Sequence, residues 1–214
     1  MPARLLSLAS VDHLVYAAPE LDAAIGDLEE RVGVRATAGG RHIGEGTHNA
    51  LIALGPSAYI EILAPDPGQP PPPRPRWLGV NGLRAARLTR WAARAANLER
   101  RVAAAERVGV ALGPVLSGRR ERSDGVLLTW RFTDPHTVLA DGIVPFFIDW
   151  GATPHPAGAA AAGATLIGLR AEHPDPAPVR AFLRRLGVEL AVSAGPAPAL
   201  VATLDTLRGR IELR

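Results

Sequence analysis

The start of the chain shows two successive patterns of hydrophobic residues. Residues 11–18 form an apolar-rich run that is typical of a buried strand. Pro19 and Glu20 then suit the first turn of a helix. The next apolar residues recur at helical spacing, and Gly33 ends the run: Leu21, Ile25, Leu28 and Val32. The pattern predicts a strand followed by an amphipathic helix.

A hairpin comes next. Residues 47–65 contain two runs rich in Leu, Ile, Ala and Tyr around the turn sequence Gly55-Pro56-Ser57. The glycine-rich segment 39–46 before it lacks the pattern of a phosphate loop and is interpreted as a short irregular strand. Residues 11–65 are therefore predicted to form a β-α-β-β-β module.

The same order of elements returns after a gap. Arg107-Val108-Gly109-Val110 repeats Arg31-Val32-Gly33-Val34, in each case at the end of a predicted helix, and Asp124-Gly125 is a strong hairpin turn. The predicted elements are a strand at 87–94, a helix at 98–108 and strands at 115–122, 126–133 and 143–150. Residues 87–150 are thus predicted to be a second module.

The remaining segments connect and extend the two modules. Residues 66–86 are predicted to be a linker, because six of the residues 66–76 are proline, which excludes helix and central strand. Residues 164–214 show a shorter strand–helix–strand pattern in which Phe182, Leu183 and Leu186 are expected to be buried. This tail is too small to fold confidently alone. It is predicted to be a partial third module packed on the first two or on another subunit.

Composition excludes several kinds of chemistry. The 214 residues contain no cysteine and no lysine, which excludes disulfides, thiolate ligands, cysteine nucleophiles and a lysine-bound pyridoxal phosphate. The net charge is only +3 with acidic residues interleaved, so nucleic-acid binding has little support. No apolar run approaches the roughly 20 residues that span a membrane, and no secretory signal is recognisable. A cytoplasmic protein is the expectation.

Glu61 is the residue that does not fit a plain core. It stands between Ile60 and Ile62 in a predicted strand, where alternation puts it on the same side as Tyr59. A carboxylate there is costly to bury unless a partner compensates it. The partner is either an arginine, which gives a structural ion pair, or a group in a functional cup.

Several local phrases resemble the glyoxalase-like branch of the vicinal oxygen chelate superfamily. They are Asp12-His13-Leu14-Val15-Tyr16, Gly46-Thr47-His48-Asn49-Ala50-Leu51, Tyr59-Ile60-Glu61-Ile62, Ser123-Asp124-Gly125 and Pro145-Phe146-Phe147-Ile148-Asp149-Trp150. The resemblance covers roughly residues 11–155. It implies an α+β fold in which paired β-α-β-β-β modules form a half-open barrel cup.

The resemblance also implies a divalent metal in the cup, held by residues from the first and fourth strands of each module. Carried over to this sequence, the first module supplies His13 and Glu61, whose imidazole and carboxylate suit Zn, Ni, Mn or Fe. The second module departs from the pattern, because Thr89 or Arg90 stands at the first-strand position. Only Asp149, on the fourth strand, is a candidate third ligand.

His48 is a candidate acid or base whose orientation depends on the hairpin turn. A turn of two or four residues would place His48 on the face of Glu61, and a turn of three would point it away. Asn49 would then hold either His48 or the substrate. The alternative is a loop-edge histidine bonded to backbone.

Other residues are candidates for substrate binding: Asn49, Tyr59, Trp91, Arg119 and Trp150. The tryptophans are expected in the core or the cup wall. Arg119 and Arg120 could bind a substrate carboxylate with paired hydrogen bonds, or could lie on a solvated hairpin edge. His42 could line the cup entrance, although exposure to solvent is the simpler expectation.

Two functional classes follow. One is a metal-assisted lyase, isomerase or dioxygenase that acts on a small oxygenated molecule, with Glu61 or His48 moving a proton through an enolate-like intermediate. The other is a non-catalytic protein that binds an antibiotic-like small molecule in the same cup. A homodimer is a further expectation, since two-fold pairs are the commonest assembly.

Overall fold

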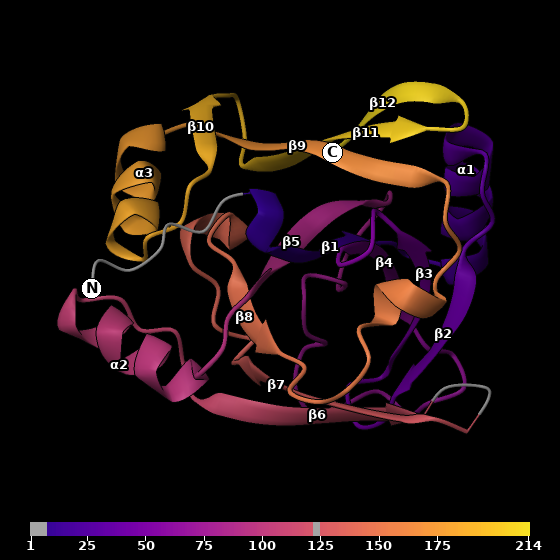
Figure 1. The fold of residues 1–214 in the computed structure, drawn as a ribbon, viewed down its shortest axis with the longest axis horizontal. Helices are drawn as coiled ribbons and strands as arrows, with labels where there is room; N and C mark the ends of the chain where they lie inside the picture. The colour runs from indigo at the N-terminus through magenta and orange to yellow at the C-terminus, as the bar shows by residue number, and fades with distance from the viewer. Residues whose placement is uncertain (1–7, 122–124) are drawn as a thin grey trace.

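The computed structural model describes residues 8–121 and 125–214, and its first module has the predicted order of elements (Figure 1). After a short 3-10 turn, η1 (Leu8–Ser10), come β1 (Val11–Ala17), α1 (Leu21–Val32), β2 (Thr37–His42), β3 (Thr47–Ala53) and β4 (Tyr59–Pro65). Helix α1 begins where the carboxylate of Glu20 accepts the backbone N–H groups of Asp22 and Ala23. It ends at Gly33, whose φ of 82° is a left-handed conformation that suits glycine.

The second module repeats this order. Its elements are β5 (Arg87–Arg94), α2 (Leu98–Arg107), β6 (Val115–Glu121), β7 (Leu127–Thr133) and β8 (Phe146–Asp149), with the turn η2 (Ala140–Gly142) before β8. The side chain of Asn97 accepts the N–H of Arg100 at the start of α2. Gly109, the counterpart of Gly33 in the repeated tetrapeptide, also has a positive φ of 73°. The repeat therefore lies at the end of the helix in both modules, although α2 ends one residue earlier in it, with Val108 as its cap.

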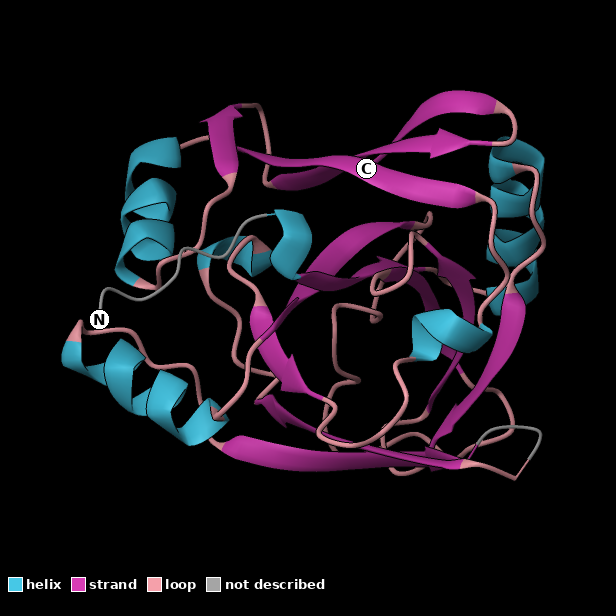
Figure 2. Ribbon diagram, viewed as in Figure 1, coloured by secondary structure: helices cyan, strands magenta, loops and turns pink. Residues whose placement is uncertain are grey.

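The strands of both modules form one eight-stranded sheet, ordered β2-β3-β4-β1-β5-β8-β7-β6. In each module the fourth strand lies parallel to the first, and β1 pairs antiparallel with β5 to join the modules. The two edge strands, β2 and β6, approach each other, so that the sheet curls into an almost closed barrel (Figures 1 and 2). The expected α+β fold with paired modules around a cup is confirmed.

The C-terminal segment forms a separate four-stranded sheet that lies across the barrel (Figure 1). After the turn η3 (Pro156–Ala159) its elements are β9 (Ala164–His173), α3 (Pro176–Arg185), β10 (Ala191–Ala194), β11 (Ala199–Thr206) and β12 (Gly209–Leu213). The sheet order is β10-β9-β11-β12. In this sheet the second strand, β10, lies beside the first strand, β9. In the two barrel modules the fourth strand, β4 or β8, lies beside the first strand, β1 or β5. The element order is repeated, but the pairing is not.

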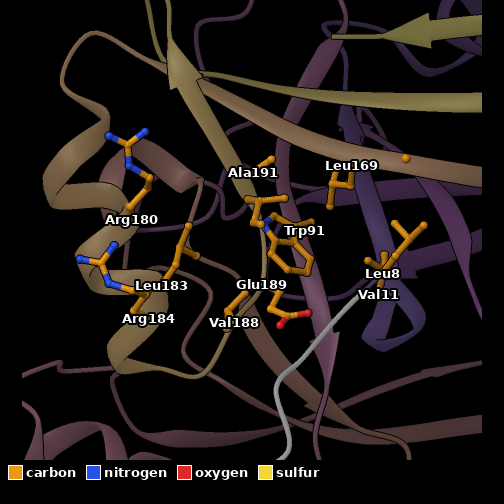
Figure 3. A pocket seen from close by; sticks show the side chains of 12 residues that line it. Leu8, Val11, Trp91, Leu169, Arg180, Leu183, Arg184, Val188, Glu189 and Ala191 are labelled. Atoms are coloured by element: carbon orange, nitrogen blue, oxygen red, sulfur yellow. The ribbon is translucent and has the colours of Figure 1, made fainter.

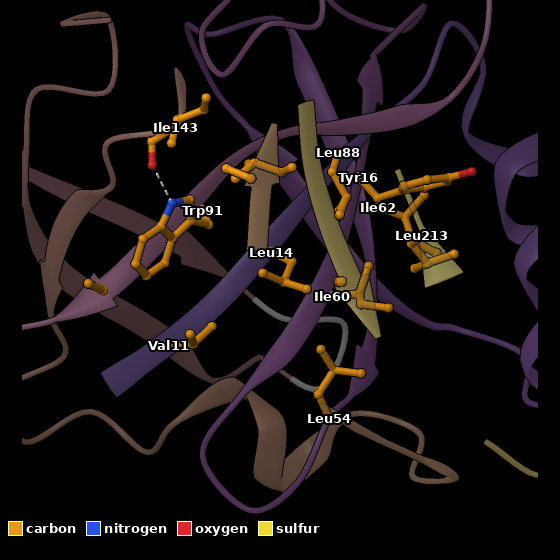
Figure 4. Packing of buried hydrophobic residues seen from close by; sticks show 14 of the residues in the cluster. Val11, Leu14, Tyr16, Leu54, Ile60, Ile62, Leu88, Trp91, Ile143 and Leu213 are labelled. Carbon is orange, nitrogen blue, oxygen red and sulfur yellow. Dashed lines mark hydrogen bonds between the residues drawn. The ribbon is translucent and has the colours of Figure 1, made fainter. Parts of the chain in front are cut away.

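A hydrophobic core fills the space between the outer face of the barrel and the C-terminal sheet (Figure 4). Leu14, Ile60 and Ile62 are fully buried there, together with side chains from α1 and from β11 and β12. The backbone N–H of Leu88 also donates to the carbonyl of Arg214 at 2.8 Å. The tail thus shares its core with the barrel, and the expected burial is found for Leu183 and Leu186, while Phe182 is only partly buried.

Residues 66–86 contain neither helix nor strand, as the prolines predict, yet they are more than a spacer. Arg76 donates to the carbonyl of Gly46, and the indole of Trp77 donates to Thr47 Oγ1 at 3.1 Å. These bonds hold Trp77 and Leu78 inside the barrel, where both are buried. No helix among the described residues is long and apolar enough to cross a membrane.

Candidate functional site

The inside of the barrel forms a cup that is lined by side chains of both modules. Strand alternation divides the side chains of β1 and β4: Leu14 and Ile60 face the outer core, whereas His13, Tyr59 and Glu61 face the cup. The residues that line the cup are His13, His42, Asn49, Tyr59, Glu61, Trp77, Leu78, Arg120, Trp130, Phe132, Pro135, Phe146, Ile148 and Trp150. The predicted meeting of His13 and Glu61 on the inner face is thus found.

The carboxylate of Glu61, 6% exposed, lies between two imidazoles. Its Oε2 is 3.7 Å from His13 Nε2, and its Oε1 is 3.7 Å from His42 Nε2. Asn49 Nδ2 donates to Oε1 at 2.6 Å, while Asn49 Oδ1 accepts the backbone N–H of Gly40 at 2.9 Å. Because the Gly40 contact fixes which end of the amide faces Glu61, Asn49 is a hydrogen-bond donor to the carboxylate.

Asp12, fully buried, fixes the orientation of His13. The Asp12 carboxylate lies 2.8 Å from His13 Nδ1 and 3.1 Å from His155 Nε2, and it accepts the indole N–H of Trp150 at 3.1 Å. Burial raises the pKa of Asp12, but hydrogen bonds from His13 and His155 outweigh burial and lower the pKa below its usual value. An ionised Asp12 only accepts hydrogen bonds, so the proton of a neutral His13 sits on Nδ1 and Nε2 faces Glu61.

His42 belongs to the cup, contrary to the expectation that it is exposed. It is 6% exposed, and its Nδ1 lies 3.0 Å from Thr47 Oγ1, the hydroxyl that also accepts from Trp77. Burial lowers the pKa of His42 to about 4, with a further lowering by Arg120 and an opposing effect of Glu61. His42 is therefore neutral near pH 7. The feature that could have predicted the inward position of His42 is its pairing with Thr47 across the β2–β3 turn.

Aromatic side chains form the opposite wall. Trp130 lies 5.3 Å from Trp150 between ring centroids, and Phe132 lies 5.9 Å from Trp77. On the polar side, Tyr59 stacks on His13 at 4.8 Å. Burial, followed by the charges of Asp12 and Glu61, raises the pKa of Tyr59 well above its usual value, so its hydroxyl keeps its proton. The predicted candidates Asn49, Tyr59 and Trp150 therefore lie in the cup, but their contact with a substrate stays a prediction.

The placement of Asp149 as a third ligand is wrong. Phe146 and Ile148 face the cup, so the intervening Phe147 and Asp149 face the other side of β8. Asp149 Oδ1 instead accepts the backbone N–H of Gly151 at 2.9 Å. A slip of one residue in aligning the two modules produced this error, and Ile148 stands where Asp149 was expected.

Of the two orientations that the sequence allowed for His48, the structure has the one that points away from the cup. Ala53 pairs with Tyr59, which leaves a five-residue connection and places His48 opposite Ala64. An odd number of turn residues puts His48 on the face away from Glu61, where it is half-buried and near Glu20. Asn49 takes the inward position instead.

Two substrate-binding candidates lie elsewhere. Trp91 is on the outer face, where its indole donates to the carbonyl of Ile143 at 2.7 Å (Figure 4). It lines a groove beside α3 together with Leu169 and Leu183 (Figure 3). Arg119 is exposed, whereas its neighbour Arg120, 6% exposed, lines the cup. In both cases the side chain lies on the opposite face of its strand from the one that faces the cup.

The donor groups do not fit a resident divalent metal. Residues 8–121 and 125–214 contain no group of three or more His, Asp or Glu side chains that could hold an ion. His13 and Glu61 come together as the resemblance implied, but in the second module the equivalent positions are apolar: Ala92 pairs with Phe146 as His13 pairs with Tyr59. His42 also lies near Glu61, but the described side chains of the cup form no group of the three ligands that a catalytic zinc site requires.

Comparison with known proteins identifies the family. The model of the glyoxalase-like domain matches residues 11–187. A hypothetical protein from Staphylococcus aureus has a similar structure, with a TM-score of 0.64 and 11% identity over 94% of this chain and 97% of that one, which supports the fold alone. No curated protein matches the chain.

Two epimerases are similar in outline. The methylmalonyl-CoA epimerase of Mycobacterium tuberculosis is 20% identical over 71% of this chain and 93% of its own, with a TM-score of 0.46. That of Streptomyces coelicolor, a variant with one substitution in complex with 2-nitronate-propionyl-CoA, is 19% identical over 70% and 98%, with a TM-score of 0.43. These scores are too low to support a statement about this chain. The family match, which covers most of the sequence, is sufficient: the chain belongs to the family of glyoxalase-like domains.

Proposed function

We propose that the cup is an active site in which Glu61 removes a proton from the carbon next to a carbonyl group. The observation that carries this proposal is the buried carboxylate that faces the cup, with Oε1 held by Asn49 at 2.6 Å and Oε2 directed toward His13. A carboxylate whose second oxygen is fixed by a donor is oriented for general-base catalysis. The reaction class is enolisation, as in an isomerase or a lyase.

The neighbours of Glu61 suit the charge that such a reaction creates. Removing the proton moves an electron pair onto the carbonyl oxygen, which then needs hydrogen-bond donors. The hydroxyl of Tyr59 keeps its proton because its pKa is raised, and Arg120 brings a positive charge to the same space. His13, oriented by Asp12, lies close enough to exchange the proton that Glu61 takes up. None of these steps requires a metal ion.

A second candidate is a non-catalytic protein that binds a small apolar molecule. The observation that favours it is the opposite wall, where the second module contributes aromatic and aliphatic side chains: Trp130, Phe132, Phe146, Ile148 and Trp150. Such a wall binds flat apolar ligands by burying their surface. In this case Glu61 would serve only to orient the ligand.

Hydrogen–deuterium exchange separates the two candidates. The protein is incubated in D₂O with phenylacetone, a neutral ketone with acidic methylene hydrogens and a flat arm, and loss of the methylene signal is followed by NMR. An enolising enzyme exchanges these hydrogens faster than buffer does. A binding protein changes the chemical shifts of the ketone without exchange above the buffer rate, and that result would contradict enolisation.

A further inference from the structure

Among the described residues that line the cup, Arg120 is the one arginine, and its position constrains the ligand. Arg120 comes from β6, at the far edge of the sheet, and lines the cup with 6% exposure. Strand β6 approaches β2 across the seam of the barrel. Burial is the main cause that lowers the pKa of His42, and the charge of Arg120 lowers it further; at Tyr59 the same charge opposes the raising effect of burial. The guanidinium therefore acts on the half of the cup that contains Glu61.

Three kinds of side chain line the cup. Arg120 offers a positive charge, Glu61 offers a base, and the second module offers a flat apolar wall made by Trp130 and Trp150. A guanidinium recognises a carboxylate through paired, charge-assisted hydrogen bonds.

We propose that the substrate is a 2-oxo acid with a flat apolar arm. Its carboxylate lies at Arg120, its carbon 3 lies at Glu61, and its arm packs against the wall of Trp130 and Trp150. This inference rests on the proposed function and names its substrate class. Glu61 takes a proton from carbon 3, the carbon 2–carbon 3 double bond forms, and the carbonyl electron pair moves to oxygen. Return of the proton to oxygen or to carbon 3 completes the step, so no oxidant or second substrate is needed.

Binding of two matched probes tests the carboxylate. Phenylpyruvate and phenylacetone share the arm and the ketone, and only phenylpyruvate carries the carboxylate. Quenching of tryptophan fluorescence reports binding, because Trp77, Trp130 and Trp150 line the cup. We expect phenylpyruvate to bind at least about tenfold more tightly than phenylacetone. Because the contact is buried, added salt should weaken this preference less than it weakens a charge contact on the surface.

Variants of neighbouring arginines locate the contact. Arg120→Gln should remove the preference for phenylpyruvate, whereas Arg119→Gln, on the exposed face of the same strand, should keep it. Circular dichroism checks that both variants fold. If Arg120→Gln does not fold, the comparison of the two probes on the unaltered protein still tests whether the cup recognises a carboxylate.

The outcomes of binding and exchange are separable. Equal binding of the two probes, no binding of phenylpyruvate, or an equal effect of the two arginine variants overturns the 2-oxo acid. Selective binding of phenylpyruvate without exchange at carbon 3 would keep the ligand class and overturn enolisation. Exchange of phenylacetone without any preference for the anion would keep enolisation and overturn the 2-oxo acid.

Discussion

The two halves of the cup have the same backbone and opposite chemistry. In the first module His13 pairs with Tyr59, and Glu61 follows two residues later on the same face; in the second module Ala92 pairs with Phe146, and Ile148 takes the place of Glu61. The polar side chains that contact Glu61 come from the first half, namely His13, His42 and Asn49, and the second half contributes the apolar wall together with Arg120. The comparison shows that one copy of a repeated module can keep the reactive groups while the other shapes the ligand.

The largest effect on stability should come from placing a carboxylate in the apolar half. Ile148→Glu puts a charge at a position that is 2% exposed, and we expect it to lower the free energy of unfolding by about 3 kcal/mol or more. Ile148→Leu, which conserves volume, should cost less than about 1.5 kcal/mol. Urea unfolding measures both. If Ile148→Glu is as stable as the original protein, the two halves are not chemically distinct.

The polar half should make stability depend on pH through His42. Burial lowers the folded-state pKa of His42 from 6.5 to about 4, so below pH 6.5 the unfolded chain binds a proton that the folded protein refuses. Stability should therefore fall as the pH drops from about 6.5 to about 4, by up to about 3 kcal/mol. Urea unfolding at several pH values, for the original protein and His42→Gln, measures the slope. A variant with an unchanged slope in this window would refute the assignment.

Asp12 should give a smaller effect in a more acidic window. Its folded-state pKa is lowered, so its contribution is present above its ordinary pKa of 3.8 and is lost as the pH falls through the lower folded value. Asp12→Asn cannot accept from His13, Trp150 and His155 together, and we expect a loss of about 1–3 kcal/mol near pH 7 with a weaker acid dependence.

An exposed acid provides the control for Asp12. Asp175 makes no capping hydrogen bond through its side chain at the start of α3, and Asp175→Asn should stay within about 0.5 kcal/mol. Chemical unfolding at pH 7 and pH 3 compares the two variants. Equal losses would show that the buried carboxylate does not organise the cup.

The smallest expected effect is that of added metal. Because the second half supplies no ligand opposite His13, titration with zinc, nickel, manganese or iron(II) should show only weak binding, and His13→Ala should change it little. Isothermal titration calorimetry measures both proteins. Tight binding of one ion per chain that disappears in His13→Ala would show that the donor set of the cup is larger than the described residues indicate.

The predictable part of the site is the part that topology controls. A strand–helix–strand unit followed by a hairpin brings the first and fourth strands side by side, and alternation then fixes that His13 and Glu61 share a face. The helix periods and the repeated Arg-Val-Gly-Val likewise mark the two modules correctly. These features depend on spacing within single elements, which the sequence contains directly.

The errors concern features that spacing does not control. Asp149 was misplaced by one residue and the orientation of His48 stayed open, because the alignment between modules and the turn length decide strand parity and neither can be derived from hydrophobic pattern. Trp77 enters the cup from a proline-rich segment without any periodicity, and His42 lies in a glycine-rich strand that resembles a loop. Tertiary contacts, rather than local propensity, place both side chains.

The central claim is that the carboxylate in the polar half is the base. It is tested most directly by measuring deuterium exchange into phenylpyruvate at carbon 3 for two variants that each remove one acid, Glu61→Gln and Asp149→Asn. Glu61 faces the cup and Asp149 faces away from it, on equivalent strands. The account predicts a loss of about 10²–10⁴-fold for Glu61→Gln and a rate within about twofold of the original protein for Asp149→Asn. Equal rates for the two variants, with both proteins folded, would contradict it.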